Sequence, residues 1–240
     1  MKILLATQPM PAAIFIDAIR ARAPELELLE YRSALSDDDL AGVDVVLGWQ
    51  MPRGLVPRLP RLRWVCSVAA GVEKLLTPDL AADVRVSRVV DREQAAGIAQ
   101  FVVAMALRHA RELERYEAQQ RERAWTRRPL PIARHRVGVL GTGATGGEIA
   151  AWLERCGLVV RGWNRRSPET LHELLAARDV QRHEPMLADD PLWTVPGITI
   201  TPHIAAQPST DTVAEQFVAS ARAYVRGDPL PNEVDRARGY

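Results

Sequence analysis

The chain has 240 residues and a formal net charge of +1 at pH 7, and 47% of its residues are hydrophobic. This composition is typical of a globular protein with one large or two small domains, and the balanced charge gives no reason to expect nucleic acid or an acidic membrane surface as a partner. No apolar run approaches the roughly 20 residues that cross a bilayer, and two cysteines do not make a disulfide framework, so we expect a cytoplasmic protein with no membrane partner.

The first hundred residues alternate between short apolar runs and a helical pattern. A helix is predicted at Ala12–Arg22, where apolar residues recur at helical spacing. Because strands and helices that alternate in this way form parallel sheets, this part of the chain is predicted to be α/β. The predicted strands are Lys2–Thr7, Glu27–Tyr31, Val43–Trp49, Arg63–Val68 and Val84–Val90.

A long helix is predicted next, roughly from Glu93 to Ala124. Its first half is apolar at helical spacing, whereas its second half, from Arg108 to Arg123, is charged and is expected to face solvent. A long helix between two α/β halves is typical of a connector between domains. A last helix is predicted at Pro208–Arg226.

A glycine motif after the connector indicates a dinucleotide. Val137–Leu140 is predicted to be a short strand, and the glycines behind it have the spacing of the dinucleotide-binding fingerprint. Such glycines permit a tight turn, a close approach of the backbone to a pyrophosphate, and close packing of the next helix. A second strand at Leu158–Trp163 completes a βαβ unit. The alternative is a glycine turn with no ligand. The predicted cofactor-binding residues of the turn are Gly141, Thr142, Gly143, Ala144, Thr145 and Gly146.

The end of the second strand predicts which nicotinamide coenzyme is bound. In NAD sites an acidic residue about 20 positions beyond the glycines holds the ribose hydroxyls. Asn164, Arg165 and Arg166 stand at this place, and two guanidinium groups suit the 2′-phosphate of NADPH. We therefore expect NADPH in preference to NADH. The alternative is that both arginines are solvated surface charge.

Several motifs occur along the chain in the same order as in one known family. They are Gly48–Pro52, Leu62–Val72, Ala99–His109, the glycine turn, Gly162–Arg165, His183–Pro185, Thr201–Ala206 and Asn232–Tyr240. A set of motifs in a fixed order is more specific than any single motif. Together these stretches resemble the D-isomer-specific 2-hydroxyacid dehydrogenases, and among these the glyoxylate/hydroxypyruvate reductase A branch.

The resemblance implies two flavodoxin/Rossmann-like domains with parallel sheets. The substrate domain is expected at residues 1–98 plus 207–240, and the cofactor domain, which includes the connector helix, at residues 99–206. The implied activity is the NAD(P)H-dependent reduction of a small 2-oxo acid, such as glyoxylate or hydroxypyruvate, by hydride transfer. No metal site is expected. The resemblance leaves open whether the chain forms a homodimer, since relatives pair through the cofactor domain.

Two catalytic roles carry over from the family where the motifs match. His203 would protonate the carbonyl oxygen of the substrate, since an imidazole titrates near neutral pH. Glu184 would hydrogen-bond the other ring nitrogen and raise the pKa of the histidine. Each residue has a plainer alternative, because a histidine after Thr-Pro is often a turn residue and Glu-Pro is a common surface dipeptide.

The resemblance also implies where the substrate binds. The backbone amides of Ala70, Gly71 and Val72 would bind the substrate carboxylate, because small side chains let the backbone come close. Trp49 would line the substrate pocket. The alternatives are ordinary turn chemistry after a strand and a core aromatic side chain.

One part of the family pattern is absent. The family carries an arginine in a Val-Gly-Arg-Gly segment, which polarises the substrate carbonyl, and this chain has no such segment. The interval from Thr142 to Pro202 is also too short for a cofactor domain of about six strands, since each βαβ unit takes roughly 30 residues. The sequence therefore predicts a truncated second domain, with a deletion near Arg178–Glu184. Arg178 and Arg182 flank this junction, and nothing in the sequence places either one at the substrate.

The deletion has structural consequences. Val137–Leu140 loses a neighbouring strand, unless the predicted strand Ile198–Thr201 moves beside it or a second subunit covers it. The helix predicted at Thr170–Ala177 loses apolar partners. We therefore expect a cofactor half that is rearranged or only marginally folded.

Three functions are compatible with these observations. The first is an active NADPH-dependent reductase of a small 2-oxo acid. The second is a catalytically impaired relative that at most binds the dinucleotide, and the deletion supports it. The third is an interaction module that uses the charged half of the connector helix, although ordinary solvation explains the same charge.

Overall fold

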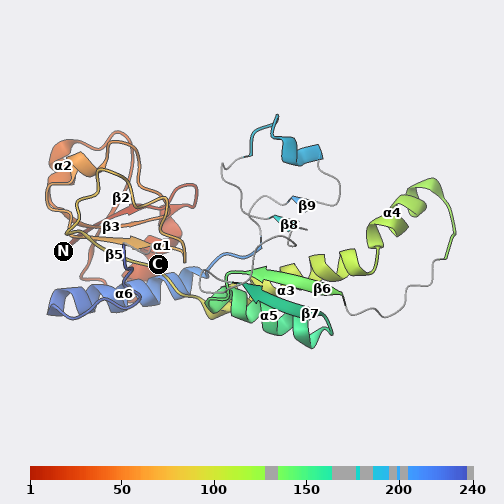
Figure 1. Cartoon of the computed structure of the whole chain (residues 1–240). Helices are drawn as coiled ribbons and strands as arrows, with labels where there is room; N and C mark the ends of the chain where they lie inside the picture. Colours follow the sequence, from red (N-terminus) through yellow and green to blue (C-terminus); the bar gives the residue numbers. More distant parts are fainter. Residues whose placement is uncertain (128–134, 164–176, 179–185, 195–198, 201–204, 237–240) are drawn as a thin grey trace. The chain divides into compact units, whose positions relative to one another are not determined.

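The computed structural model describes residues 1–127, 135–163, 177–178, 186–194, 199–200 and 205–236. The chain forms two compact units (Figure 1). Unit 1 consists of residues 1–91 and 208–240, and unit 2 of residues 92–207. The strands of both units pair in parallel, so the predicted α/β class with parallel sheets is confirmed.

Unit 1 is built on a five-stranded sheet with the strand order β2-β1-β3-β4-β5, in which every pair is parallel. This is the order of flavodoxin-like folds. The central strands β1, β3 and β4 are mostly apolar and buried, because helices or loops cover both faces of the sheet. They span Lys2–Ala6 (β1), Glu27–Glu30 (β2), Val43–Gly48 (β3), Trp64–Ser67 (β4) and Arg85–Ser87 (β5).

The five predicted strands of unit 1 are confirmed, but β5 is shorter than predicted. It ends at Ser87 rather than at Val90. The amide of Arg88 donates to the carbonyl of Asn232 at 3.2 Å, and the amide of Val89 donates to the carbonyl of Ala69 at 3.2 Å. Because these two amides bond outside β4, the chain leaves the sheet after Ser87.

One face of the sheet is covered by α1 (Ala12–Arg20) and α6 (Thr210–Arg226), and the helix predicted near the C-terminus is therefore confirmed. Phe217 of α6 is fully buried and its ring stacks on Trp64 with 5.3 Å between the ring centroids. The indole nitrogen of Trp64 donates to Ser87 Oγ at 2.9 Å. Helix α6, near the end of the chain, therefore packs in the same core as the strands formed by the first residues of the chain.

The opposite face is covered by α2 (Asp37–Ala41), the short helix η1 (Val56–Arg58) and the loops around them. The C-terminal segment closes the edge at β5. Val234 donates its amide to the Val86 carbonyl at 2.8 Å, and Arg85 binds the carboxylate of Glu233 through two hydrogen bonds of 2.8 and 2.7 Å. The hydrogen bonds to Arg85 lower the pKa of Glu233.

The prediction of one continuous connector helix is wrong. The chain forms α3 (Arg92–Ala110) and α4 (Leu113–Glu122), and Glu112 between them has a φ of 51°. In a continuous helix, residues nine apart point to opposite sides. Here Arg108 of α3 instead binds the carboxylate of Glu117 of α4, with Nη2 2.7 Å from Oε2. No residue of α4 is buried, and the ion pair of Arg108 with Glu117 joins this helix to α3.

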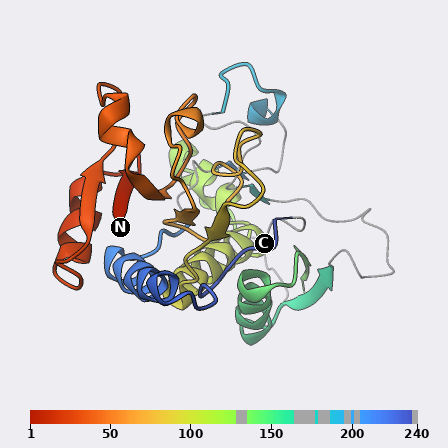
Figure 2. The same ribbon diagram turned by 90° about the vertical axis from the view of Figure 1, so that its left-hand side faces the viewer.

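The centre of unit 2 is the βαβ unit β6 (Arg136–Leu140), α5 (Ala144–Arg155) and β7 (Val159–Trp163), which confirms the prediction from the glycine motif. The two strands are parallel, and α5 lies along them (Figure 2). Among the described residues, the buried members of this core are Val139, Leu153 and Leu158. Side chains from α3 pack against them.

The remaining described strands of unit 2 form a separate pair, β8 (Ala177–Arg178) and β9 (Thr199–Ile200). The late strand predicted at Ile198–Thr201 therefore pairs with β8 and does not move beside β6. Within the described ranges, β6 pairs with β7 alone. Ala177 is in a strand, which contradicts the helix predicted at Thr170–Ala177, whose other residues lie outside the described part.

The stacking of α6 on the sheet generates a first prediction. Phe217→Ala should lower the free energy of unfolding of unit 1 by about 3–5 kcal/mol, because it leaves a cavity against Trp64. The matched control is Val225→Ala on the same helix, whose side chain is 70% exposed and which should change stability by less than about 0.5 kcal/mol. Chemical denaturation followed by tryptophan fluorescence measures both, and equal effects would contradict the packing described here.

The two cysteines allow a second prediction. Burial raises the pKa of the Cys66 thiol to about 12, whereas Cys156 at the end of α5 is exposed. Because the thiolate is the reactive form, a thiol reagent at pH 8 should modify Cys156 in the native protein and Cys66 only after unit 1 unfolds. Mass spectrometry of labelled peptides checks this, with Cys156→Ser as the control that should leave native protein unlabelled.

Candidate active site

The predicted cofactor turn lies between β6 and α5. Gly141, Thr142 and Gly143 form the turn and are exposed, and α5 begins at Ala144, so that Thr145 and Gly146 stand in its first turn. The amide of Gly141 donates to the carbonyl of Trp163 at 2.7 Å, which ties the turn to the end of β7. The helix therefore begins immediately beyond the carboxyl ends of two parallel strands.

Two glycines of the turn are required by the backbone. Gly141 has a φ of 87°, a conformation that strains any residue with a Cβ. A Cβ at Gly146 would overlap the carbonyl oxygen of Gly141 and lie 2.9 Å from its carbon. A Cβ at Gly143 would meet nothing within 4 Å, so the space above this residue is open. Gly141 thus permits the turn, Gly146 permits close packing of the helix, and Gly143 leaves room for a ligand to approach, as in the dinucleotide-binding fingerprint.

This geometry fits the pyrophosphate of a dinucleotide. The first amides of a helix have no partner inside the helix, and the helix dipole places a partial positive charge there. The N-cap residue Gly143 has no side chain to occupy those amides. An exposed turn, an open position above it and free helical donors together form a phosphate cradle.

The predicted residues that choose between NADPH and NADH lie outside the described part of the chain. These are Asn164, Arg165 and Arg166, which follow the last residue of β7. The predicted catalytic residues His203 and Glu184 also lie outside it. Their roles stay predictions.

The predicted carboxylate loop follows β4 in unit 1. Each of its carbonyls has a partner: Ala69 accepts from Val89, Ala70 from Arg88, Gly71 from Ser67 Oγ at 2.7 Å, and Val72 from two later amides. In contrast, the described residues provide no hydrogen-bond partner for the amides of Ala70, Gly71 and Val72. Three successive amide donors without acceptors are what a bound anion needs.

Trp49 lies at the carboxyl end of β3, next to this loop in the order of the sheet. It is half-buried, and the ammonium group of Lys74 lies 5.0 Å from the centre of its ring. Arg88, at the carboxyl end of β5, reaches the loop from the other side. Neither cation is apparent as a site residue from the sequence. Arg88 falls inside a strand predicted to run to Val90, and Lys74 follows the loop as a single exposed lysine.

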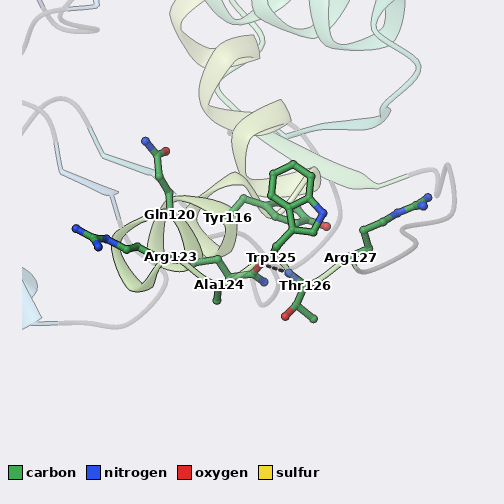
Figure 3. A pocket seen from close by; sticks show the side chains of 8 residues that line it. Tyr116, Gln120, Arg123, Ala124, Trp125, Thr126 and Arg127 are labelled. Carbon is green, nitrogen blue, oxygen red and sulfur yellow. Dashed lines mark hydrogen bonds between the residues drawn. The ribbon is translucent and has the colours of Figure 1, made fainter.

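A separate hollow of about 550 Å³ lies beside the C-terminal end of α4 (Figure 3). Trp125 is 95% exposed there, and the side chains of Arg123 and Arg127 point in opposite directions. No predicted site residue lines it, so it has no part in the candidate site. Its lining residues are Tyr116, Gln119, Gln120, Arg123, Ala124, Trp125, Thr126 and Arg127.

Other kinds of site find no support among the described residues. Nowhere in the described ranges do three or more histidine, cysteine or acidic side chains gather in a metal-binding arrangement. The described helices include none with the length and hydropathy of a bilayer-spanning segment.

The sheet order of unit 1 and the strand–glycine turn–helix of unit 2 define an α/β protein with a Rossmann-type domain. Residues 103–176 match the family model of the D-isomer specific 2-hydroxyacid dehydrogenase NAD binding domain. This part of the chain is therefore similar to the NAD binding domain of the D-isomer specific 2-hydroxyacid dehydrogenases.

Similar proteins span nearly the whole chain. The glyoxylate/hydroxypyruvate reductase A of Yersinia enterocolitica is 25% identical, over 94% of this chain and 96% of its own. A D-isomer specific 2-hydroxyacid dehydrogenase of Xanthobacter autotrophicus, solved with NADPH and MES, is 26% identical with a TM-score of 0.83, over 100% of this chain and 99% of its own. An NADPH-dependent glyoxylate/hydroxypyruvate reductase of Sinorhizobium meliloti, solved with NADP and sulfate, shares the fold at 22% identity with a TM-score of 0.84, over 100% of both chains.

The chain is shorter than these relatives. The alignment with the Yersinia protein extends over 305 positions, which is more than the 240 residues present here. The relative therefore has stretches without a counterpart in this chain.

The glycine turn generates a third prediction. Gly146→Ala should weaken NADPH binding by about tenfold or more, because the added methyl group meets the Gly141 carbonyl and forces the turn apart. Fluorescence titration of the nicotinamide measures this. Gly147→Ala is the matched control, since a Cβ there meets nothing within 4 Å and alanine favours helix. Unchanged NADPH affinity in Gly146→Ala would mean that the turn is not where NADPH binds.

Proposed function

We propose that the chain is an NADPH-dependent reductase that converts a small 2-oxo acid, such as glyoxylate or hydroxypyruvate, into the 2-hydroxy acid. The observation that carries the proposal is the glycine turn, in which Gly141 and Gly146 leave the amides at the start of α5 open to a phosphate. The similarity of residues 103–176 to the NAD binding domain of the D-isomer specific 2-hydroxyacid dehydrogenases supports the reaction class. The three open amides of the loop after β4 support an acid as substrate.

The proposed chemistry divides between the two units. When bound, the nicotinamide supplies the hydride. The amides of Ala70, Gly71 and Val72 hold the substrate carboxylate, and Trp49 forms a wall of the pocket. His203 donates a proton to the carbonyl oxygen as it becomes a hydroxyl, and Glu184 keeps the imidazole in the tautomer that can donate.

The preference for NADPH rests on Arg165 and Arg166. Two guanidinium groups beyond β7 match the 2′-phosphate, and no carboxylate stands at this place to bind the ribose hydroxyls of NADH. The names of the relatives from Xanthobacter and Sinorhizobium, which mention NADPH or NADP, agree with this preference.

A catalytically impaired relative that binds the dinucleotide without turnover is the second candidate. The observation that favours it is the reduced length of the chain, together with a β6–β7 pair that has no further strand among the described residues. The family's Val-Gly-Arg-Gly segment is missing as well. The two candidates agree on the cofactor and differ on the chemistry.

A fourth prediction separates these candidates. Purified protein mixed with NADPH and glyoxylate or hydroxypyruvate should oxidise the coenzyme, followed as loss of nicotinamide absorbance, and more slowly with NADH at equal concentration. His203→Ala should lower kcat by about 100- to 10,000-fold, the usual contribution of a general acid. NADPH binding without turnover would support the impaired relative, and absence of both would reject each candidate.

A further inference from the structure

The carboxyl ends of β3, β4 and β5 meet at one edge of the parallel sheet of unit 1, and a cation stands at this edge next to the open amides. In parallel sheets ligands bind beyond this edge. β5 ends at Ser87, and the following residue, Arg88, is half-buried. The bonds from the amides of Arg88 and Val89, to Asn232 and Ala69 respectively, fix its backbone between the C-terminal segment and the loop after β4.

The side chain of Arg88 turns toward that loop. Its Nη1 lies 3.4 Å from the carbonyl oxygen of Ala70. The same peptide chain presents the open amides of Ala70, Gly71 and Val72. The guanidinium is therefore held beside three backbone donors that lack acceptors within the described part of the chain.

The donors of Arg88 are only partly used. A guanidinium has five N–H groups in a planar fork, and it cannot lose its charge. One group is directed at Ala70, and the structure gives no other side-chain partner for Arg88 among the described residues. No described carboxylate forms an ion pair with it. The fork can therefore still bind a planar carboxylate in the bidentate arrangement that arginine prefers.

An acidic side chain beside the loop makes a positive charge necessary for binding an anion there. Glu73 is exposed, and its carboxylate oxygen lies 2.7 Å from the position of a Cβ added to Gly71. This negative charge repels an incoming anion. The open amides orient an anion, and the positive charge of Arg88 offsets the repulsion by Glu73.

We propose that Arg88 binds the carboxylate of the 2-oxo acid together with the amides of residues 70–72, and that it thereby determines the preference for acids over uncharged carbonyl compounds. The inference rests on the proposed function, since it names the residue that recognises the substrate. It gives the chain a substrate-binding arginine in unit 1, whereas the arginine expected from the family pattern is absent from the sequence.

A purely structural role would be to hold the Ala70 carbonyl. Arg88→Gln separates the two roles, because glutamine keeps an N–H donor and loses the charge. Arg88→Lys keeps the charge and loses the fork. Arg63→Met is the matched control, since Arg63 is exposed, also donates to a single carbonyl, that of Leu62 at 3.3 Å, and precedes β4 at the opposite edge of the sheet.

The experiment titrates oxamate, a carboxylate that imitates a 2-oxo acid and is not reduced, into the full chain by calorimetry, with and without NADPH. Arg88→Met and Arg88→Gln should weaken oxamate binding by about 10- to 100-fold, and Arg88→Lys by less. In turnover, both neutral variants should raise the KM for glyoxylate by a similar factor while kcat changes less. The salt dependence of KM should also become flatter, because a screened charge pair has been removed. Melting temperatures report whether each variant is folded.

Two results overturn the proposal. Oxamate affinity of Arg88→Gln within twofold of the unchanged chain means that the charge is not used, and absence of oxamate binding to the unchanged chain means that the loop holds no anion. Loss of oxamate binding in the neutral variants supports the proposal even where no coenzyme is oxidised, and then only the reductase activity fails. Turnover with an unaltered KM in Arg88→Met rejects the role of Arg88 and leaves the reductase intact.

Discussion

The parallel pairing of β3, β4 and β5 is the constraint on which the proposed substrate loop of unit 1 depends. In this register Trp64 pairs with Val45 on one side and with Arg85 on the other, so the three strands end at one edge. Residues far apart in the chain, namely Trp49, the loop after Ser67 and Arg88, are brought together there. The stacked pair of Trp64 and Phe217 anchors this sheet to a helix from the other end of the chain, so the core and the site share one framework.

Unit 2 is organised differently. Its described core is small, and its glycine turn depends less on burial than on backbone geometry, because Gly141 takes a positive φ and Gly146 packs against the carbonyl of Gly141. A turn of this kind needs only one strand, one helix and a second strand to hold its shape. This explains how a chain shorter than its relatives keeps a recognisable phosphate cradle.

The division of roles follows from these two frameworks. In the proposed function, the anion is held in unit 1 by donors that a well-packed sheet fixes, and the coenzyme is held in unit 2 by the first amides of a helix. Both proposed sites use backbone N–H groups, which need small residues nearby and no particular side chain. The proposed anion site also uses a positive charge, which a side chain has to supply. In unit 1 Arg88 lies beside the open amides and supplies it.

The sequence by itself determined the five strands of unit 1, the βαβ unit and the glycine turn, because alternating apolar patterns and glycine spacing are local signals. It missed the break at Glu112, since helical propensity does not register the ion pair of Arg108 with Glu117 that the break allows. It also missed the end of β5, which is set by a hydrogen bond to Asn232 from the far end of the chain. Only the tertiary structure decided that Arg88 leaves the ladder and faces the open amides, because contacts between distant segments place it there.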